Sequence, residues 1–283
     1  FSVCLGYFIV PLLNIQAAEG VKSLPGLLFN IDIPPLCSVM SALVAAVFIG
    51  LGASWAKADK TSSILNELQQ IVLLLVSKIL LPILPIFVAA NFIVLSWQGS
   101  IGRLWIFLPV LLIVIFAHYI WLALLYGVAA IYSGKNSLEV LRHYRPAYLT
   151  AIGTMSSAAT LGVALNCAHN SSVLKKESVD FAVPLFANIH LCGSVLTEVF
   201  FISVVSQLLY GTLPGFGDYI LFVFLLGIFA IGAPGVPGGT VLASLGLIVS
   251  VLGFDETGTA MLIALYALQD SFGTDCNITG DWE

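Results

Sequence analysis

Polar side chains of the kinds that hold cations recur at helical spacing in the last apolar segment, which contains "LQDSFGTDCNITGD". Successive intervals of four, three and four residues place them on one stripe of a helix: Asp270, Thr274, Asn277 and Asp281. Carboxylates inside a membrane are costly, so they indicate function by default. Because this segment contains no Lys or Arg, the expected partner is a substrate ammonium group or a metal ion.

Structural interpretations of the acidic residues stay open beside the functional one. Asp281 is either a ligand or a solvated residue at the membrane boundary, and Asp270 is either functional or part of an incidental buried hydrogen bond. Asp275 points off the stripe, so a structural role and a functional role are both open for it.

A second polar group interrupts the preceding apolar segment, within "FANIHLCGSVLTE" at 186–198. It comprises Asn188, His190, Cys192, Gly193 and Ser194. His190 is either a hydrogen-bonded structural residue or a proton carrier, whereas a single cysteine such as Cys192 is more often a packing residue. Glu198 follows Ser194 by one helical turn and is a further acid within the membrane.

The composition predicts a multi-span membrane protein. The chain is 59% hydrophobic and 9% charged, its mean hydropathy is +1.05, and its formal net charge is -5. Its five cysteines form no C-x-x-C pair, which argues against a disulfide framework or a zinc site. We expect a lipid membrane as its surroundings, no nucleic-acid partner and no organic cofactor.

The elements that must position these residues are apolar helices joined by short loops. We expect them at 1–13 (the end of a span), 34–56, 66–97, 104–132, 147–167, 179–210, 219–253 and 259–279. Seven basic residues lie in three loops, which the positive-inside rule places in the cytoplasm: Lys57, Lys60, Lys135, Arg142, Arg145, Lys175 and Lys176.

That orientation predicts two re-entrant hairpins. Loops 133–146 and 170–178 can share one side only if 147–167 enters and leaves on the same face, and 219–253 has flanks without Lys or Arg that would both be outside. Each segment is interrupted, by "GTMSSAAT" (153–160) and by "GAPGVPGG" (232–239). Irregular backbone at membrane depth is tolerated where it lines a cavity. Two hairpin–span units of opposite orientation form an inverted repeat, which is typical of secondary transporters. Two ordinary spans are the alternative.

These motifs, in this order, make the chain resemble the dicarboxylate/amino acid:cation symporter family. The resemblance covers a piece from the end of the third span to most of the eighth. It implies an all-α, multi-span, elevator-type transporter that forms a homotrimer in the plasma (inner) membrane. A partial scaffold would occupy 1–132, and a mobile transport domain would occupy 133–283 with hairpin 1, span 7, hairpin 2 and span 8.

Site residues follow from the same resemblance, position by position. The substrate would lie between the hairpin tips and would be bound by Ser156, Ser157, Ser194, Val236, Pro237, Gly238, Asp270, Gly273, Thr274 and Asn277. Asp270 would hold its amino group, and Asn277 would lie near its α-carboxylate. The coupling cation would be bound by Asn277 and Asp281, with backbone carbonyls around Phe186, Asn188, His190 and 230–233.

Two departures from the family pattern modify this expectation. Members that carry acidic substrates have an arginine where this chain has Gly273, and the alternative arginine position holds Met155, so a second substrate carboxylate would be buried unpaired. We therefore expect a neutral amino acid. The family's "NMDGT" is "HLCGS" here. Hard cations prefer oxygen ligands, so we expect the loss of at least one sodium site, with coupling to fewer Na+ or to H+ through His190 or Glu198.

Three other functions compete with cation-coupled uptake of neutral amino acids. An acidic amino acid or dicarboxylate symporter, and an uncoupled exchanger or channel on the same scaffold, remain alternatives. An enzyme is not expected, because the chain has no G-x-S-x-G or H-E-x-x-H motif and His190 has no evident nucleophile partner.

Overall fold

The computed structural model describes residues 1–13, 39–75, 107–233 and 235–282, together with single residues between 78 and 93. All regular structure in these ranges is helical, which confirms the predicted all-α class. The chain divides into two compact units, one formed by Phe1–Gly20 with Ser100–Glu283 and the other by Val21–Gly99. We call the first the main unit, and it contains every candidate site residue.

The smaller unit contains a helix pair. α2 (Val39–Trp55) and α3 (Asp59–Leu75) pack against each other across a turn in which Lys57 has a φ of 48°. α3 begins before the apolar segment predicted from residue 66, because Asp59 stabilises its first turn and polar residues continue the helix. The start of the predicted 34–56 span, most of 76–97 and the loop 98–103 lie outside the described residues.

In the main unit, three predicted spans are helices close to their expected bounds. Residues 1–13 form α1 (Ser2–Ile9) and the short helix η1 (Val10–Leu13), 104–132 form α5 (Phe107–Ser133), and 259–279 form α13 (Glu256–Gly280). A short helix, α6 (Ser137–Arg142), follows α5. In the described part of the chain, Phe107–Ser133 and the interrupted segment Lys176–Tyr210 are long and apolar enough to cross a membrane, and four shorter apolar helical stretches accompany them.

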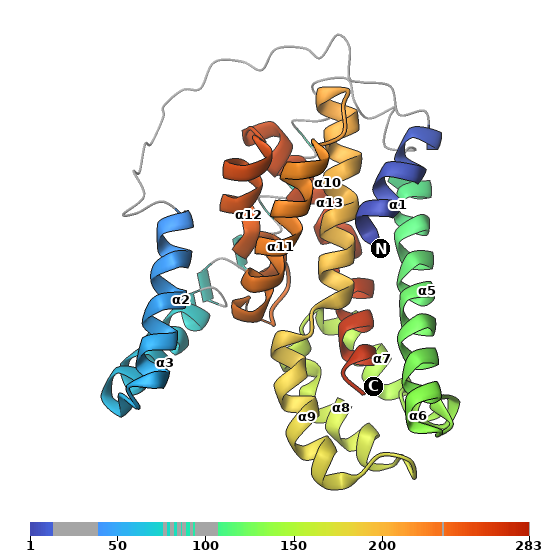
Figure 1. Ribbon diagram of the computed structural model, residues 1–283. Coiled ribbons are helices and arrows are strands. Elements are labelled where there is room, and N and C mark those ends of the chain that lie inside the picture. Colours follow the sequence, from blue (N-terminus) through green and yellow to red (C-terminus); the bar gives the residue numbers. More distant parts are fainter. Residues whose placement is uncertain are drawn as a thin grey trace. The chain divides into compact units, whose positions relative to one another are not determined.

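The three interrupted segments each become two helices (Figure 1). Segment 147–167 is α7 (Arg145–Thr154) and α8 (Ser157–His169), 179–210 is α9 (Lys176–Ile189) and α10 (Cys192–Tyr210), and 219–253 is α11 (Phe216–Gly232) and α12 (Gly239–Leu252). α7 packs on α8, and α11 packs on α12. Whether these pairs are re-entrant in a membrane stays a prediction.

The breaks occur where the backbone leaves the helical region. Met155 has a φ of 50°, and Ser156 is extended and caps α8 by accepting a hydrogen bond from the Ala159 amide at 3.2 Å. Gly238 has a φ of 70° directly before α12, in the left-handed region that glycine adopts without a steric penalty. The Gly/Pro segment therefore ends one helix and begins another.

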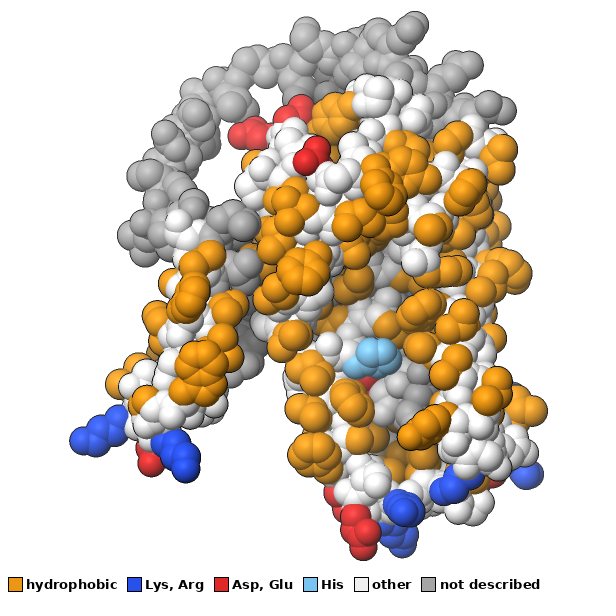
Figure 2. Space-filling model, in the orientation of Figure 1, with side chains coloured by type: hydrophobic (Ala, Val, Ile, Leu, Met, Phe, Trp, Pro, Cys, Tyr) orange, Lys and Arg blue, Asp and Glu red, His pale blue; other side chains and the backbone are white. Residues whose placement is uncertain are grey.

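Two basic loops meet at one end of the main unit, where Figure 2 shows Lys and Arg side chains together. The Lys135 ammonium donates to the Val173 carbonyl at 2.9 Å, and the Glu139 carboxylate accepts from the Ser171 hydroxyl at 2.6 Å and the Ser172 amide at 3.0 Å. Loops 133–146 and 170–178 therefore lie together, in agreement with the prediction that both are on one side of the membrane.

The hydrogen bonds to Glu139 predict a pH dependence of stability. They lower the pKa of this carboxyl from its ordinary 4.5 to about 2, with Ser171 as the main cause. Because the folded pKa is the lower one, the stabilisation is complete above about pH 4.5 and is lost as the pH falls toward about 2. We expect the unfolding temperature of Glu139→Gln to fall less than that of wild type as the pH is lowered through this range. The effect is small because Glu139 is partly exposed. Equal acid sensitivity of variant and wild type in thermal unfolding would contradict it.

The most extensive helix contact in the described residues is between α10 and α13, and a glycine permits it. A Cβ atom on Gly193 would lie 2.4 Å from the Gly273 carbonyl oxygen and 2.5 Å from the Cys276 Cβ. We expect Gly193→Ala to destabilise the protein by about 1–3 kcal/mol, as overpacking does. Thermal unfolding measures this. Gly162→Ala in α8 is the control, because its added Cβ would meet no atom within 4 Å beyond its chain neighbours and its own helix backbone. It should match or exceed wild type, and an equal loss in both variants would contradict the argument.

The compact units are defined by packing, whereas the predicted scaffold and transport domains, divided at residue 132, stay a prediction. α1 packs on α10, and α5 packs on α10 and α13, so both belong with 133–283. The physical reason is burial, because the inner faces of α1 and α5 cover helices of the candidate site. Which of these helices move together stays a prediction.

Candidate functional site

The Gly/Pro segment between α11 and α12 forms the tip of the second helix pair, and Asp270 of the predicted stripe binds it. Asp270, on α13 and only 4% exposed, accepts a hydrogen bond from the Gly238 amide at 2.7 Å. Val236 and Pro237 lie partly exposed just before Gly238. The structure therefore brings the Gly/Pro tip to the carboxylate that the sequence singled out.

The tips of the two helix pairs also touch each other. The Ser156 hydroxyl donates to the Gly235 carbonyl at 2.6 Å, and the Ala158 amide donates to the same oxygen at 3.3 Å. A Cβ on Gly235 would lie 3.6 Å from the Ser157 Cβ. Segments far apart in sequence thus converge beside α13, where the family resemblance implied that the two tips meet.

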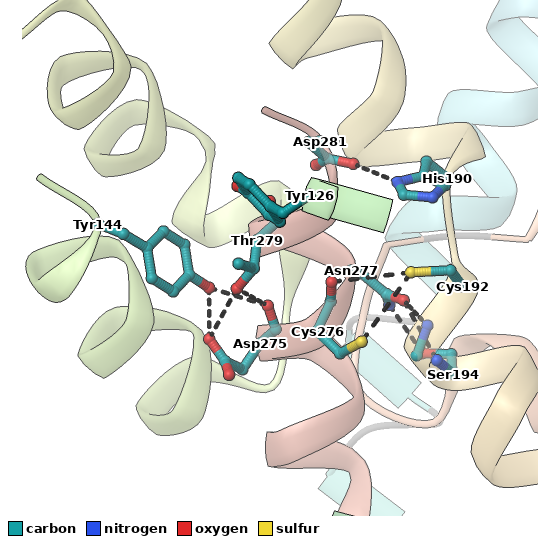
Figure 3. Close-up of polar contacts among 11 residues, drawn as sticks. Tyr126, Tyr144, His190, Cys192, Ser194, Asp275, Cys276, Asn277, Thr279 and Asp281 are labelled. Atoms are coloured by element: carbon teal, nitrogen blue, oxygen red, sulfur yellow. Dashed lines mark hydrogen bonds and ion pairs between the residues drawn. The ribbon is translucent and has the colours of Figure 1, made fainter. Parts of the chain in front are cut away.

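Asn277 binds the start of α10 from the neighbouring helix (Figure 3). Its side-chain oxygen accepts from the Gly193 amide at 2.8 Å and the Ser194 amide at 3.2 Å, and its amide nitrogen donates to the Ser194 hydroxyl at 2.8 Å. The residue at the N-cap of α10, Leu191, has no side-chain oxygen to do this. Asn277 therefore satisfies amides that every helix start leaves open.

Gly273, on α13, faces the start of α10 without a side chain of its own. A Cβ at this position would meet Ser194 backbone atoms and the Thr197 hydroxyl at 3.6 Å, which is ordinary van der Waals contact. Thr274 beside it is 3% exposed. Residues 177–283 contain no Lys or Arg, and no ion pair to Asp270 occurs in the described part of the chain.

The last acid of the stripe meets the histidine of the interrupted span. His190 Nδ1 lies 3.2 Å from Asp281 Oδ1, and Figure 3 shows the two side chains facing each other. The second oxygen, Oδ2, is buried and has no hydrogen-bond partner within the described residues. An unsatisfied buried carboxylate oxygen is a suitable ligand for a hard cation such as Na+, so Asp281 fits the predicted cation site.

The other predicted cation ligands are placed less directly. The Asn277 side-chain oxygen is engaged by α10 amides, and the Asn188 amide donates to the Pro184 carbonyl of its own helix at 3.0 Å. The Phe186 carbonyl accepts from the His190 amide at 2.8 Å. No group of three or more His, Cys, Asp or Glu side chains in the described residues is arranged to hold a metal ion. The assignment of cation ligands to Asn277, Phe186, Asn188 and His190 stays a prediction.

Asp275 has the structural role that the sequence left open. The Tyr144 hydroxyl donates to its carboxylate and, at 2.8 Å, to its backbone carbonyl, while the Thr279 hydroxyl donates to the same carbonyl at 2.7 Å. These contacts tie α7 to α13 on the side of α13 away from the stripe (Figure 3).

A buried polar network next to the site was missed by the sequence reasoning. His118 on α5 is 3% exposed, and its Nε2 lies 3.0 Å from the Gly193 carbonyl and 3.1 Å from the Thr197 hydroxyl. Thr197 in turn donates to Gln269 at 2.8 Å. The available signal was an ionisable residue in the middle of the apolar segment 104–132.

The chain is similar to known membrane transporters. The sodium:dicarboxylate symporter family matches residues 11–282. The excitatory amino acid transporter of Caenorhabditis elegans is 28% identical over 147 residues, which are 52% of this chain and 29% of that protein. Excitatory amino acid transporter 3 of Homo sapiens is 31% identical over 147 residues, 52% of this chain and 28% of that protein. Excitatory amino acid transporter 3 of Bos taurus is 28% identical over 250 residues, 86% of this chain and 47% of that protein.

The chain spans less than half the length of each of these relatives. The family and the relatives are named as transporters, not enzymes. Because the family match extends over nearly the whole chain, the chain belongs to the sodium:dicarboxylate symporter family.

Proposed function

We propose that this chain is the core of a secondary active transporter for small neutral amino acids, coupled to a cation gradient. The observation that carries the proposal is the buried Asp270 carboxylate, which lies at the meeting point of two broken helix pairs and has no basic side chain paired with it among the described residues. A buried charge needs a partner. The ammonium group of an amino acid supplies one, and it arrives and leaves with the substrate.

The neighbouring groups support binding of the rest of an amino acid. Ser194 and Asn277 offer a hydroxyl and an amide within one hydrogen-bonded group, and Ser156 and Ser157 lie at the facing tip. Gly273 carries no positive charge for a side-chain carboxylate. This favours alanine or serine over glutamate, although the relatives are named excitatory amino acid transporters.

Coupling to Na+ is supported by the family and by the unsatisfied Asp281 oxygen. Coupling to H+ is the second candidate, and a specific observation favours it as well. Glu198 is fully buried on α10, accepts a hydrogen bond from Ser244 on α12, and has a second oxygen without a hydrogen-bond partner in the described residues. An acid that lies between α10 and the second helix pair is placed where a proton could bias the position of that pair.

Transport by an elevator motion would require the helix pairs to carry the substrate across a plasma (inner) membrane in which the protein is multi-pass. The contact between Gly238 and Asp270 then acts as the closed position of a gate at the second tip. A homotrimer and a scaffold in 1–132 belong to the same proposal.

The deciding experiment is uptake of labelled serine or alanine into proteoliposomes. An inward sodium gradient is compared with a proton gradient alone. Accumulation driven by sodium supports the Asp281 site, and accumulation driven only by protons assigns coupling to Glu198 or His190. Equilibration without accumulation would instead indicate an uncoupled exchanger or channel. Uptake of aspartate that neutral amino acids fail to inhibit would overturn the proposed specificity.

A further inference from the structure

Two cysteines from different helices lie side by side at the candidate site. Cys192 is the first residue of α10 and Cys276 lies on α13, and their sulfur atoms are 4.0 Å apart (Figure 3). The Cys192 sulfur also lies 3.8 Å from the Cys276 carbonyl. Cys276 is 1% exposed, whereas Cys192 is partly exposed. Cys192 is therefore the more exposed residue of the pair, and the Cys276 thiol lies directly beside it.

Backbone geometry brings these thiols within reach of a covalent bond. Because Gly193 has no side chain, α10 approaches so closely that an added Cβ there would lie 2.5 Å from the Cys276 Cβ. Gly280 likewise leaves space, since its added Cβ would lie 3.4 Å from the Cys192 sulfur. A disulfide needs its sulfurs about 2.05 Å apart and its Cβ atoms about 3.8 Å apart. The sulfur atoms, 4.0 Å apart, must therefore move closer by about 2 Å for a disulfide to form.

We propose that Cys192 and Cys276 form a reversible redox switch that locks the start of α10 to α13. Hydrogen peroxide is the oxidant. The Cys192 thiolate attacks one peroxide oxygen, an S–O bond forms, the O–O bond breaks, and hydroxide leaves. The Cys276 thiol then attacks the sulfenic sulfur, the S–S bond forms, and water leaves. In total, two thiols and one peroxide give one disulfide and two waters, and a dithiol reductant reverses the reaction.

A disulfide between Cys192 and Cys276 would join α10 to α13 directly beside residues of the candidate site. Gly193 and Ser194 follow Cys192, and Asn277 follows Cys276, and these are the groups that already hydrogen-bond to each other. Oxidation would make that contact permanent. Any step of transport that separates α10 from α13 would then stop, a consequence that depends on the proposed transport function.

The crosslink can be tested without measuring transport. A protease site inserted at Thr212, which is exposed in the loop between α10 and α11, divides the chain so that Cys276 is the only cysteine on its C-terminal side. After peroxide treatment and cleavage, we expect the two fragments to remain joined on a denaturing, non-reducing gel and to separate after reduction. Mass spectrometry should find the 192 and 276 peptides joined, with the loss of two hydrogens.

Matched cysteine variants decide which thiols react. Cys192→Ser and Cys276→Ser should each abolish the joined product. Cys167→Ser, a change at another buried cysteine, should leave it intact. Separate fragments in peroxide-treated wild type, or a joined product in Cys192→Ser, would overturn the proposal. If a serine variant does not fold, the identity of the joined peptides in wild type decides the question.

Transport adds an independent readout. Peroxide should lower uptake of labelled serine or alanine by wild type at least several-fold, reductant should restore it, and Cys276→Ser should be insensitive. Uptake that is unaffected by a demonstrated crosslink would overturn the locking role. A complete absence of uptake by the reduced protein would count against the proposed function, whereas the gel result would still decide whether the disulfide forms.

Discussion

We expect Gly273→Arg to admit aspartate to the site that we propose for neutral amino acids. In the wild-type site a second substrate carboxylate would be buried without a positive partner, and a broken buried pair costs about 3–5 kcal/mol. Restoring the partner should therefore lower the aspartate concentration that inhibits uptake by on the order of 100-fold or more. The added Cβ fits, because its nearest neighbours lie 3.6 Å away.

Competition between labelled serine and unlabelled aspartate in proteoliposomes measures this change. Gly273→Gln is the matched control, since it adds a side chain of comparable reach without the charge. It should reduce uptake of neutral amino acids without admitting aspartate. Strong inhibition of wild-type uptake by aspartate, or equal effects of Arg and Gln, would show that the charge at position 273 does not set specificity.

Asp270→Asn should abolish uptake while preserving the fold. The asparagine oxygen can still accept the hydrogen bond from the Gly238 amide, which is 2.7 Å long in wild type. What is lost is the negative charge, which the proposal assigns to the substrate ammonium group. Loss of one partner from a buried pair predicts a fall in kcat/KM for uptake on the order of 100-fold or more. The unfolding temperature of the substrate-free protein should stay the same or rise, because a buried unpaired charge has been removed.

A neighbouring acid provides the contrast for this experiment. Asp275→Asn alters a carboxylate that is bound by Tyr144 and lies off the stripe, so its expected effect is on thermal stability rather than on apparent substrate affinity. Thermal unfolding and uptake are measured for both variants. If Asp270→Asn unfolds the protein, or if it transports as well as wild type, Asp270 is a structural residue.

Local patterns were sufficient for the helices and for the residues of the stripe. Hydropathy marked segments such as Phe107–Ser133, because a helix exposed to lipid must be apolar along its length. Gly and Pro marked the break between α11 and α12, since neither continues a helix well. Helical spacing placed Asp270 and Asn277 on one face of α13 before any contact was known.

Those local patterns could not predict which residues far apart in the sequence form hydrogen bonds with each other. Asn277 caps α10, Ser156 binds the Gly235 carbonyl, and His118 lies against Gly193 and Thr197, in each case between residues far apart in sequence. Hydrogen-bond partners of this kind depend on which helices pack together, and a helical period reports only which face is polar.

What the sequence by itself determined was the class of protein, the broken helices and the line of polar residues on α13, because these depend on local composition and spacing. The tertiary structure alone decided that Asp270 holds Gly238, that His190 faces Asp281, and that Cys192 lies beside Cys276. It also showed that α1 and α5 pack against the helices that carry the candidate site. The physical reason is that close approach at Gly193 and burial between packed helices are properties of pairs of elements.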